Sequence, residues 1–210
     1  MCNTLRVRWT IIPKIAPQPW VTCSGCGGLR AFESSDKIRL NANGRKLDAW
    51  LIYKCTGCDS TWNRSIFERK SVREIDSITL DALQSNDPDW IRAVAFDLEA
   101  LKRQTPRIDE FAACDVRKEL LGESPGWKHL QIEFSISLPV SARLDRLLAS
   151  ELKISRSQLS TLHEAGLLKA TPDRTGILRR RIRDSLRIAF DLSGLDDREV
   201  WRPLAVGKNR

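Results

Sequence analysis

The sequence predicts an α+β protein with an N-terminal four-cysteine ribbon, a helical connector and a small C-terminal module of two helices and a sheet. Three observations predict it. Two C-x-x-C pairs lie 28 residues apart, apolar residues at helical spacing follow Asn86-Asp87-Pro88, and two short helical segments with strand-like segments follow residue 140. We place the ribbon with an N-terminal strand at 1–72, the connector at 73–126, the module at 127–194 and a mobile tail at 195–210.

The first element is a strand. Residues 5–13 alternate apolar and polar side chains at first, which is the period of a half-buried strand. Three prolines then enforce an extended connection into the first cysteine pair; they are Pro13, Pro17 and Pro19. We expect this strand to add to the sheet of the ribbon.

Four cysteines follow in two pairs and indicate a structural zinc site. The ligands are Cys23, Cys26, Cys55 and Cys58. Four thiolates satisfy tetrahedral Zn²⁺ and leave no open position for chemistry. Gly25 and Gly57, before the second cysteine of each pair, are expected to take positive φ. Two disulfides or a redox dithiol are the alternatives, and disulfides would need an oxidising compartment.

Two further cysteines and four tryptophans have other expected roles. Cys114 is expected to be a small buried hydrophobe, and Cys2 lies close to the terminus. Neither is at ligand spacing. The tryptophans in or beside the ribbon are Trp9, Trp20, Trp50 and Trp62. Core packing is the expected role of Trp9 and Trp50, whereas stacking on nucleic-acid bases competes with it, most of all for Trp20 and Trp62.

A β-hairpin fills the gap between the cysteine pairs. Residues 29–33 and 37–40 run toward Asn43-Gly44, a strong hairpin turn signal, and residues 46–54 return to the second pair. This arrangement is typical of a zinc ribbon.

The hairpin and the segment after it carry a family resemblance. FESSDKIRLNANGRKLDAWLIYKC and KCTGCDSTWNRSIFER resemble a bacterial family known as domain of unknown function 1062, and the resemblance runs from about Trp9 through most of the chain. It implies that the hairpin and TWNRSIFER form one unit with the cysteines. The family has no established activity to carry over.

The connector is expected to be helical. Apolar residues at helical spacing predict a helix from Pro88 to near Gln104, before Pro106, and 108–121 is a further helical candidate closed by Gly122. Its carboxylates are read as helix caps and solvated faces rather than as an acid/base pair; they are Asp87, Asp89, Asp97, Glu99, Asp109 and Glu110.

The C-terminal module opens with a period-two strand at 130–138, ended by Pro139. Short helices are expected at 143–149 and 154–164, the second closed by Gly166, and strand-like segments at 167–170 and 181–190. His129 and His163 are expected to be ordinary surface or core residues.

This order of elements resembles the small RNA-binding "S-four" domain first known from a ribosomal small-subunit protein. The resemblance covers residues 140–192 and implies binding of structured RNA through Arg143, Arg146, Ser155, Arg156, Ser157 and Lys169. The sequence departs from the pattern where 171–176 replace the expected Asn-Gly turn and where Ser185 replaces a glycine.

The distribution of charge points the same way. Residues 1–72 carry 12 basic and 5 acidic side chains, 73–139 carry 8 and 13, and 140–210 carry 15 and 9. Arg179, Arg180 and Arg181 form a dense basic strip, and guanidinium groups suit phosphate oxygens. The competing interpretation is a solvated basic surface, with Asp145 paired to a neighbouring arginine. For RNA binding we expect Arg143, Arg146, Arg156 and Lys169 to share one exposed face.

The resulting hypothesis is a non-catalytic, zinc-containing, cytoplasmic RNA-binding protein that acts on structured RNA or a ribosomal particle, with ribosomal or transfer RNA as the target class. The first alternative is a protein–protein adaptor that uses the zinc ribbon, and the second is an RNA-modifying enzyme. No nucleophile–base pair, phosphate-binding glycine loop or open metal site supports an enzyme. No apolar run reaches the length of about 20 residues that a membrane helix needs, so no membrane partner is expected.

Overall fold

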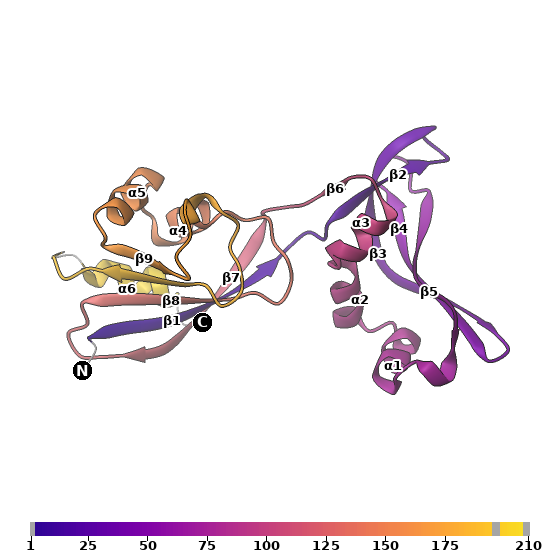
Figure 1. Cartoon of the computed structure of the whole chain (residues 1–210), viewed down its shortest axis with the longest axis horizontal. Helices are drawn as coiled ribbons and strands as arrows, with labels where there is room; N and C mark the ends of the chain where they lie inside the picture. The colour runs from indigo at the N-terminus through magenta and orange to yellow at the C-terminus, as the bar shows by residue number, and fades with distance from the viewer. Residues whose placement is uncertain (1–2, 195–197, 208–210) are drawn as a thin grey trace. The chain divides into compact units, whose positions relative to one another are not determined.

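The computed structural model describes residues 3–194 and 198–207 and divides the chain into two compact units (Figure 1). One unit, here the cysteine unit, is Ile15–Phe111. The other, here the terminal unit, combines Met1–Lys14 with Ala112–Arg210. Both contain helices and a sheet, which confirms the mixed α+β class. The predicted domain boundaries differ from these units because the first strand and the connector pack elsewhere than expected.

The cysteine unit is an antiparallel sheet of order β5-β4-β3-β2-β6. Its strands are β2 (Gln18–Cys23), β3 (Gly28–Asn43), β4 (Lys46–Cys55), β5 (Thr61–Ser71) and β6 (Ile108–Asp109). The predicted hairpin is confirmed, because β3 and β4 pair with each other and the chain turns at Gly44. The φ of Gly44 is 60°, in the left-handed region that glycine adopts without strain.

Three helices pack on one face of this sheet. They are α1 (Ser77–Ser85), α2 (Pro88–Ala95) and α3 (Leu98–Gln104), and a 3-10 turn, η1 (Val72–Glu74), precedes them. Ile91, Ala95 and Leu101 join Leu51 and Tyr53 in one core. The connector is therefore part of the cysteine unit, not a separate domain.

Aspartates divide the connector into these helices. Asp76, Asp87 and Asp97 each accept a backbone N–H from the first turn of α1, α2 and α3. The single predicted helix from Pro88 to Gln104 is wrong because Asp97 caps a new helix after Phe96. The interpretation of Asp87 and Asp97 as caps is confirmed.

A buried arginine connects the sheet to α2. Arg64 on β5 is 2% exposed, and its Nη1 donates to the Val94 carbonyl (2.8 Å) and the Tyr53 hydroxyl (3.3 Å). The Val94 carbonyl lies in the last turn of α2, where the helix dipole favours a cation. The buried Arg64 Nε has no hydrogen-bond partner among the described residues.

The tryptophans of the sheet differ in their placement. Along β4, Leu47, Ala49, Leu51 and Tyr53 are buried, whereas Trp50 lies on the opposite face and is partly exposed. The expectation that Trp50 packs in the core is therefore wrong: strand alternation turns it away. Trp62 packs against Tyr53 with ring centroids 5.4 Å apart, and Trp20 stacks on the Arg107 guanidinium, 4.0 Å from the ring centroid.

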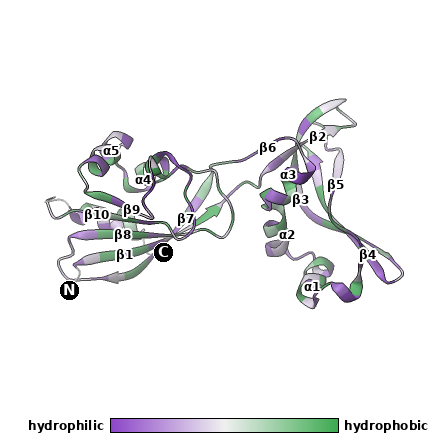
Figure 2. Ribbon diagram, in the orientation of Figure 1, coloured by the Kyte–Doolittle hydropathy of each residue, from purple (hydrophilic) through white to green (hydrophobic). Residues whose placement is uncertain are grey.

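The terminal unit is a second five-stranded sheet, of order β7-β1-β8-β10-β9. Its strands are β1 (Thr4–Pro13), β7 (Cys114–Glu123), β8 (His129–Ser135), β9 (Leu168–Thr171) and β10 (Arg187–Asp191). β1 pairs antiparallel with β7 and parallel with β8, so the expectation that it joins the ribbon is wrong. Its apolar residues Leu5, Val7, Trp9 and Ile11 belong to the core of this unit. Figure 2 colours the strands of this sheet by hydropathy, with hydrophobic and hydrophilic segments along them.

β7 replaces the helix expected over 108–121. Cys114 and Val116 pack against the core at a spacing of two residues, which is the strand period. Pairing with β1 satisfies the backbone of β7, and this long-range partner overrides the local helical pattern. The strand-like segment expected at 181–190 is also shorter, because β10 starts at Arg187.

Helices cover one face of this sheet. They are α4 (Leu144–Leu152), α5 (Arg156–Glu164) and α6 (Trp201–Val206), with 3-10 turns η2 (Ile177–Arg179) and η3 (Arg198–Val200). In the part of the chain that the structure describes, no helix combines the length and the apolar character needed to cross a membrane.

Two side chains from the sheet of the terminal unit hydrogen-bond to the last turn of helix α6. The Trp9 indole donates to the Ala205 carbonyl (2.8 Å), and Lys118 Nζ donates to the Leu204 carbonyl (2.6 Å). The expected mobile tail is thus wrong for 201–206, since these contacts satisfy carbonyls that a helix end leaves free. Residues 195–197 and 208–210 of that tail lie outside the described residues.

Candidate functional site

Two turns of the cysteine unit bring four sulfur atoms together. Cys23 ends β2 and Cys55 ends β4, and Cys26 and Cys58 follow in the turns. All four sulfurs lie within 4.8 Å of one another, with 3.3 Å between Cys23 and Cys58 and 3.9 Å between Cys26 and Cys55. Four sulfurs at about 2.3 Å from one ion would be about 3.8 Å apart. The group therefore has the dimensions of a four-thiolate metal site.

The described cysteines are free thiols, so the disulfide alternative does not apply. Cys114 lies in the terminal unit, where burial raises its pKa, and it is not part of the group. Cys2 lies outside the described residues. Among the residues that the structure describes, these four cysteines are the one group of side chains that could hold a metal ion.

The two turns are built alike. The Gly27 N–H donates to the Cys23 carbonyl (2.9 Å), and the Asp59 N–H donates to the Cys55 carbonyl (3.1 Å). Gly27 and Asp59 have positive φ, 70° and 60°. The prediction that Gly25 and Gly57 take this conformation is wrong: the left-handed residue is the one after each second cysteine.

Gly25 is required for space. A Cβ built on Gly25 would lie 2.7 Å from Ser60 Oγ, closer than real Cβ contacts, and 3.0 Å from Cys58 Sγ, which is tighter than most of them. A Cβ on Gly57 would lie 3.5 Å from Cys26 Sγ, an ordinary contact distance. The two glycines thus occupy equivalent sequence positions with different steric demands.

We expect Gly25→Ala to weaken metal retention and Gly57→Ala to leave it nearly unchanged. In Gly25→Ala the new methyl group must displace Cys58 or Ser60, which moves a ligand. Competition with a chromophoric chelator measures the difference, and a loss of about 10- to 100-fold in affinity is the scale typical of disturbed outer-sphere partners. Equal affinity of the two variants would contradict the steric argument.

Hydrogen bonds set the protonation of the thiols. Burial acts to raise the pKa of Cys23, but hydrogen bonds from the Cys26 backbone and the thiols of Cys58 and Cys55 lower it to about 6. The hydroxyl and backbone N–H of Ser60 lower the pKa of Cys58. A hydrogen bond with Cys58 and burial raise the pKa of Cys26 to about 12. A bound cation must displace this last proton, so metal binding releases protons.

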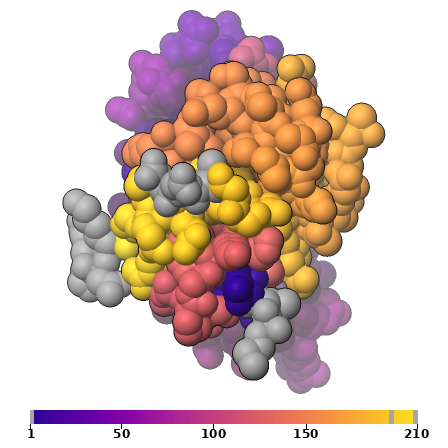
Figure 3. Space-filling model, turned by 90° about the vertical axis from the view of Figure 1, so that its left-hand side faces the viewer, coloured from indigo at the N-terminus to yellow at the C-terminus, as the bar shows by residue number. Residues whose placement is uncertain are grey.

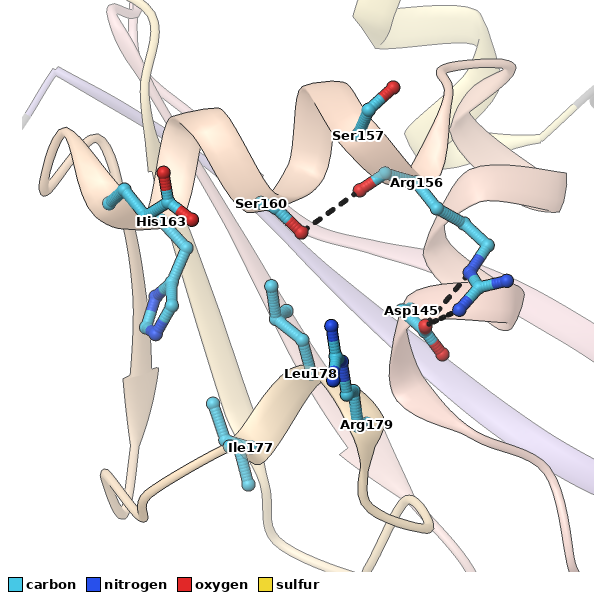
Figure 4. Close-up of a pocket in the computed structure, with 10 residues that line it drawn as sticks. Asp145, Arg156, Ser157, Ser160, His163, Ile177, Leu178 and Arg179 are labelled. Atoms are coloured by element: carbon cyan, nitrogen blue, oxygen red, sulfur yellow. Dashed lines mark hydrogen bonds and ion pairs between the residues drawn. The ribbon is translucent and has the colours of Figure 1, made fainter.

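A second candidate site lies in the terminal unit and is organised by Asp145. This residue is 4% exposed, and its carboxylate accepts hydrogen bonds from Arg143 Nε (3.1 Å) and Nη2 (2.8 Å) and from Arg156 Nε (2.9 Å). Arg156 Nη2 also lies 2.8 Å from the same carboxylate (Figure 4). The expected pairing of Asp145 with a neighbouring arginine is confirmed, and it involves two arginines.

A groove of about 410 Å³ lies between α5 and η2. Figure 4 shows Arg156, Ser160 and His163 on the α5 side and Ile177 to Arg179 on the opposite side. In Figure 3 the residues of α5 belong to the orange region in the upper part of the view. Ser157, Glu164 and Asp145 complete the polar lining. Sequence reasoning missed Ser160 and His163, although 156, 160 and 163 have the i, i+4, i+7 spacing of one helix face.

The structure does not bring all predicted residues to this groove. Leu168 and Ala170 on β9 face the core, so Lys169 between them lies on the other face of the sheet. The expectation of one face shared by Arg143, Arg146, Arg156 and Lys169 is therefore wrong.

The remaining predicted residues have local roles. Ser155 caps α5, because its Oγ accepts from the Gln158 N–H (3.0 Å). Arg180 donates to the Thr175 carbonyl, and Arg181 pairs through its backbone with Arg143. Arg146 on α4 and Arg179 on η2 are exposed.

Comparison with known proteins gives one match. No curated protein and no solved structure matches the chain. Residues 40–174, more than half of the 210, match the family described as "Protein of unknown function (DUF1062)". This segment includes the second cysteine pair, the three helices of the cysteine unit and α4 and α5. The chain therefore belongs to the DUF1062 family of proteins of unknown function.

Proposed function

We propose that the chain is a non-catalytic, zinc-containing RNA-binding protein that recognises structured RNA, free or in a ribosomal particle. The groove between α5 and η2 beside Asp145 carries the proposal. The succession of α4, α5, β9 and β10 supports a likeness of this region to the S-four domain. Four cysteines on two turns of a hairpin sheet support a zinc ribbon, whose closed ligand set gives the metal a structural role.

The groove suits phosphate groups because Asp145 holds two guanidinium groups in place. The Arg143 and Arg156 side chains are 31% and 52% exposed, so each keeps contact with solvent while Asp145 neutralises one of the two charges. A fixed guanidinium loses less conformational freedom when it binds a phosphate. Arg179 lines the groove and is exposed, and Arg146, which follows Asp145 on α4, is a second exposed cation.

This arrangement suits recognition of the RNA backbone better than recognition of a specific base sequence. Duplex RNA is recognised mostly through its shape, phosphates and 2′-hydroxyls. The Ser157 and Ser160 hydroxyls and the His163 imidazole supply donors and acceptors between the arginines. The chemistry of the lining therefore favours backbone contacts.

We expect Arg146→Ala with Arg179→Ala to weaken binding of a hairpin RNA and to flatten its salt dependence. Each lost phosphate contact should reduce the slope of log K against log salt by roughly 0.7–0.9, so the pair should reduce it by about two contacts. Titrations of labelled hairpin RNA between about 50 and 200 mM salt measure the slope.

Lys169→Ala with Arg187→Ala is the matched control. It removes the same charge from the same unit, but both side chains lie on the sheet face away from α5. A control pair as damaging as the groove pair, or a wild-type protein that binds no hairpin RNA, would contradict the proposal and favour the protein adaptor.

A further inference from the structure

The cysteine unit has a second surface with a different chemistry. Its sheet packs on helices with one face, and the opposite face of β3, β4 and β5, here the outer face, carries Trp50. The indole is partly exposed and is not part of the core of this unit. Its large flat ring offers an apolar surface on which another ring can stack.

Cations surround Trp50 on the outer face. In the sheet register, Trp50 lies opposite Arg39 on β3 and Ser65 on β5, and Lys37 lies opposite Ile52. Directly opposed residues have Cβ atoms about 4.5–5.5 Å apart, so Arg39 is an immediate neighbour of the indole. Lys46 and Lys54 stand on the same side of β4, at the period of two residues.

The exposed cations are the second feature of the outer face. The outer face and its hairpin turn carry five exposed cations, namely Lys37, Arg39, Arg45, Lys46 and Lys54. In the part of the chain that the structure describes, none of the five has a carboxylate within ion-pair distance.

The acidic side chains of this face offset these cations only in part. Glu33 lies opposite Lys54, and the Asp48 carboxylate accepts hydrogen bonds from the Arg69 backbone N–H (2.6 Å) and from Asn41 Nδ2 (3.4 Å). The terminal unit differs, because its sheet cations Arg6 and Arg8 pair with Glu133 and Glu119. The five cations therefore leave the hairpin face with an excess of positive charge.

We propose that the outer face binds single-stranded nucleic acid, with a base stacked on Trp50 and backbone phosphates on Arg39, Lys37 and Lys46. An aromatic side chain within a band of unpaired cations is the combination that sequence-tolerant binding of single strands uses. Every base has a π face, so stacking needs no specific sequence. A duplex buries its base faces and cannot make this contact.

The charge argues against a protein as the occupant. Trp50 and Ile52 are the large apolar side chains at the centre of the face, and both are only partly exposed. Protein interfaces are depleted of lysine in their core, whereas this face has lysine on both strands. The proposal does not depend on the RNA-binding groove of the terminal unit, since it concerns other residues of another unit.

Fluorescence anisotropy with a labelled oligouridylate of about 10 nucleotides tests the proposal on the full chain. Trp50→Ala should weaken binding by roughly 5- to 150-fold, the range of one base–aromatic stack. Trp50→Phe should keep most of the affinity, because a phenyl ring also stacks. Arg39→Ala should weaken binding and flatten the salt dependence by about one contact.

Arg103→Ala is the matched control for charge, because Arg103 is an exposed cation on α3, outside the outer face. Unchanged affinity in Trp50→Ala, or an equal loss in Arg39→Ala and Arg103→Ala, would overturn the inference. So would a wild-type protein that binds no single strand at about 50 mM salt, and Trp50-dependent self-association in that case would identify a second copy as the occupant.

The same series separates the two proposals. In one outcome, hairpin RNA binding depends on Arg146 and Arg179, and oligouridylate binding does not depend on Trp50. That outcome would support the proposed function and contradict this inference. Trp50-dependent binding of oligouridylate without any binding of hairpin RNA would do the reverse.

Discussion

Cys55→Ser is expected to abolish metal binding and to unfold the cysteine unit. Cys55 is 1% exposed and belongs to the same core as Phe32 and Tyr53, so its thiolate joins the metal group to the packed sheet. Serine is a poor ligand for a soft thiolate site. The apparent binding energy of a structural zinc is about 10–16 kcal/mol and is largely folding energy, more than a unit of this size can lose.

Elemental analysis measures the metal, and hydrogen–deuterium exchange across β3 and β4 measures the unfolding. Cys114→Ser is the control, because Cys114 lies in the terminal unit and outside the sulfur group. Full metal content in Cys55→Ser, or a loss in Cys114→Ser, would show that the ligand set is wrong. Exchange in the terminal unit should change little in either variant.

Arg64→Ala is expected to destabilise the cysteine unit by about 3 kcal/mol or more. The substitution leaves the Val94 carbonyl and the Tyr53 hydroxyl without their donor, at about 1–3 kcal/mol for a buried unsatisfied group. It also removes a large buried side chain, and the resulting cavity adds to the loss. Since about 1 kcal/mol shifts Tm by about 4–8 °C in a domain of this size, the unit should melt more than about 10 °C lower.

Arg64→Met and Arg103→Ala are the useful comparisons. Methionine fills most of the space without donating hydrogen bonds, so its cost isolates the polar contribution of Arg64. Arg103 is exposed, and its loss should change Tm by little. A melting temperature of Arg64→Ala that equals that of Arg103→Ala would mean that the buried guanidinium does not hold α2 on the sheet.

Local sequence patterns were sufficient for the hairpin and the cysteine group. The Asn43-Gly44 turn and the alternation along β4 depend on neighbouring residues, so they are legible in the sequence. The position of β1 cannot be read from the sequence in this way, because its period of two fits any sheet with an apolar face. Its partners β7 and β8 lie more than 100 residues away. The helix expected over 108–121 failed for the same reason.

The candidate sites likewise divide into those set by local spacing and those set by long-range packing. Cysteine spacing identified all four members of the cysteine group because two-residue spacers bring both sulfurs of a pair to one side of a turn. The neighbourhood of Asp145 depends on how α4 packs against α5, which no spacing rule gives. The alternation of Trp50 with Ala49 and Leu51 along β4 indicates the outer face for Trp50. This alternation predicts its position better than the size of the side chain, which favours the core.

The cysteine unit is an insertion between two paired strands, and this affects how the chain is made. Pro13 of β1 lies opposite Cys114 of β7, and the Lys14 N–H donates to the Ala113 carbonyl (2.9 Å), so the insert begins and ends at adjacent positions. At about 5–20 residues per second, the ribosome needs roughly 5–20 s to synthesise the residues between them. During that time Leu5, Val7 and Trp9 have no sheet to join.

The insert contains all its own strand partners, so it can fold before β7 is synthesised. Once the insert is folded, its two ends are close together, so β1 and β7 are joined by a short effective loop. A shorter loop lowers the entropic cost of pairing β1 with β7.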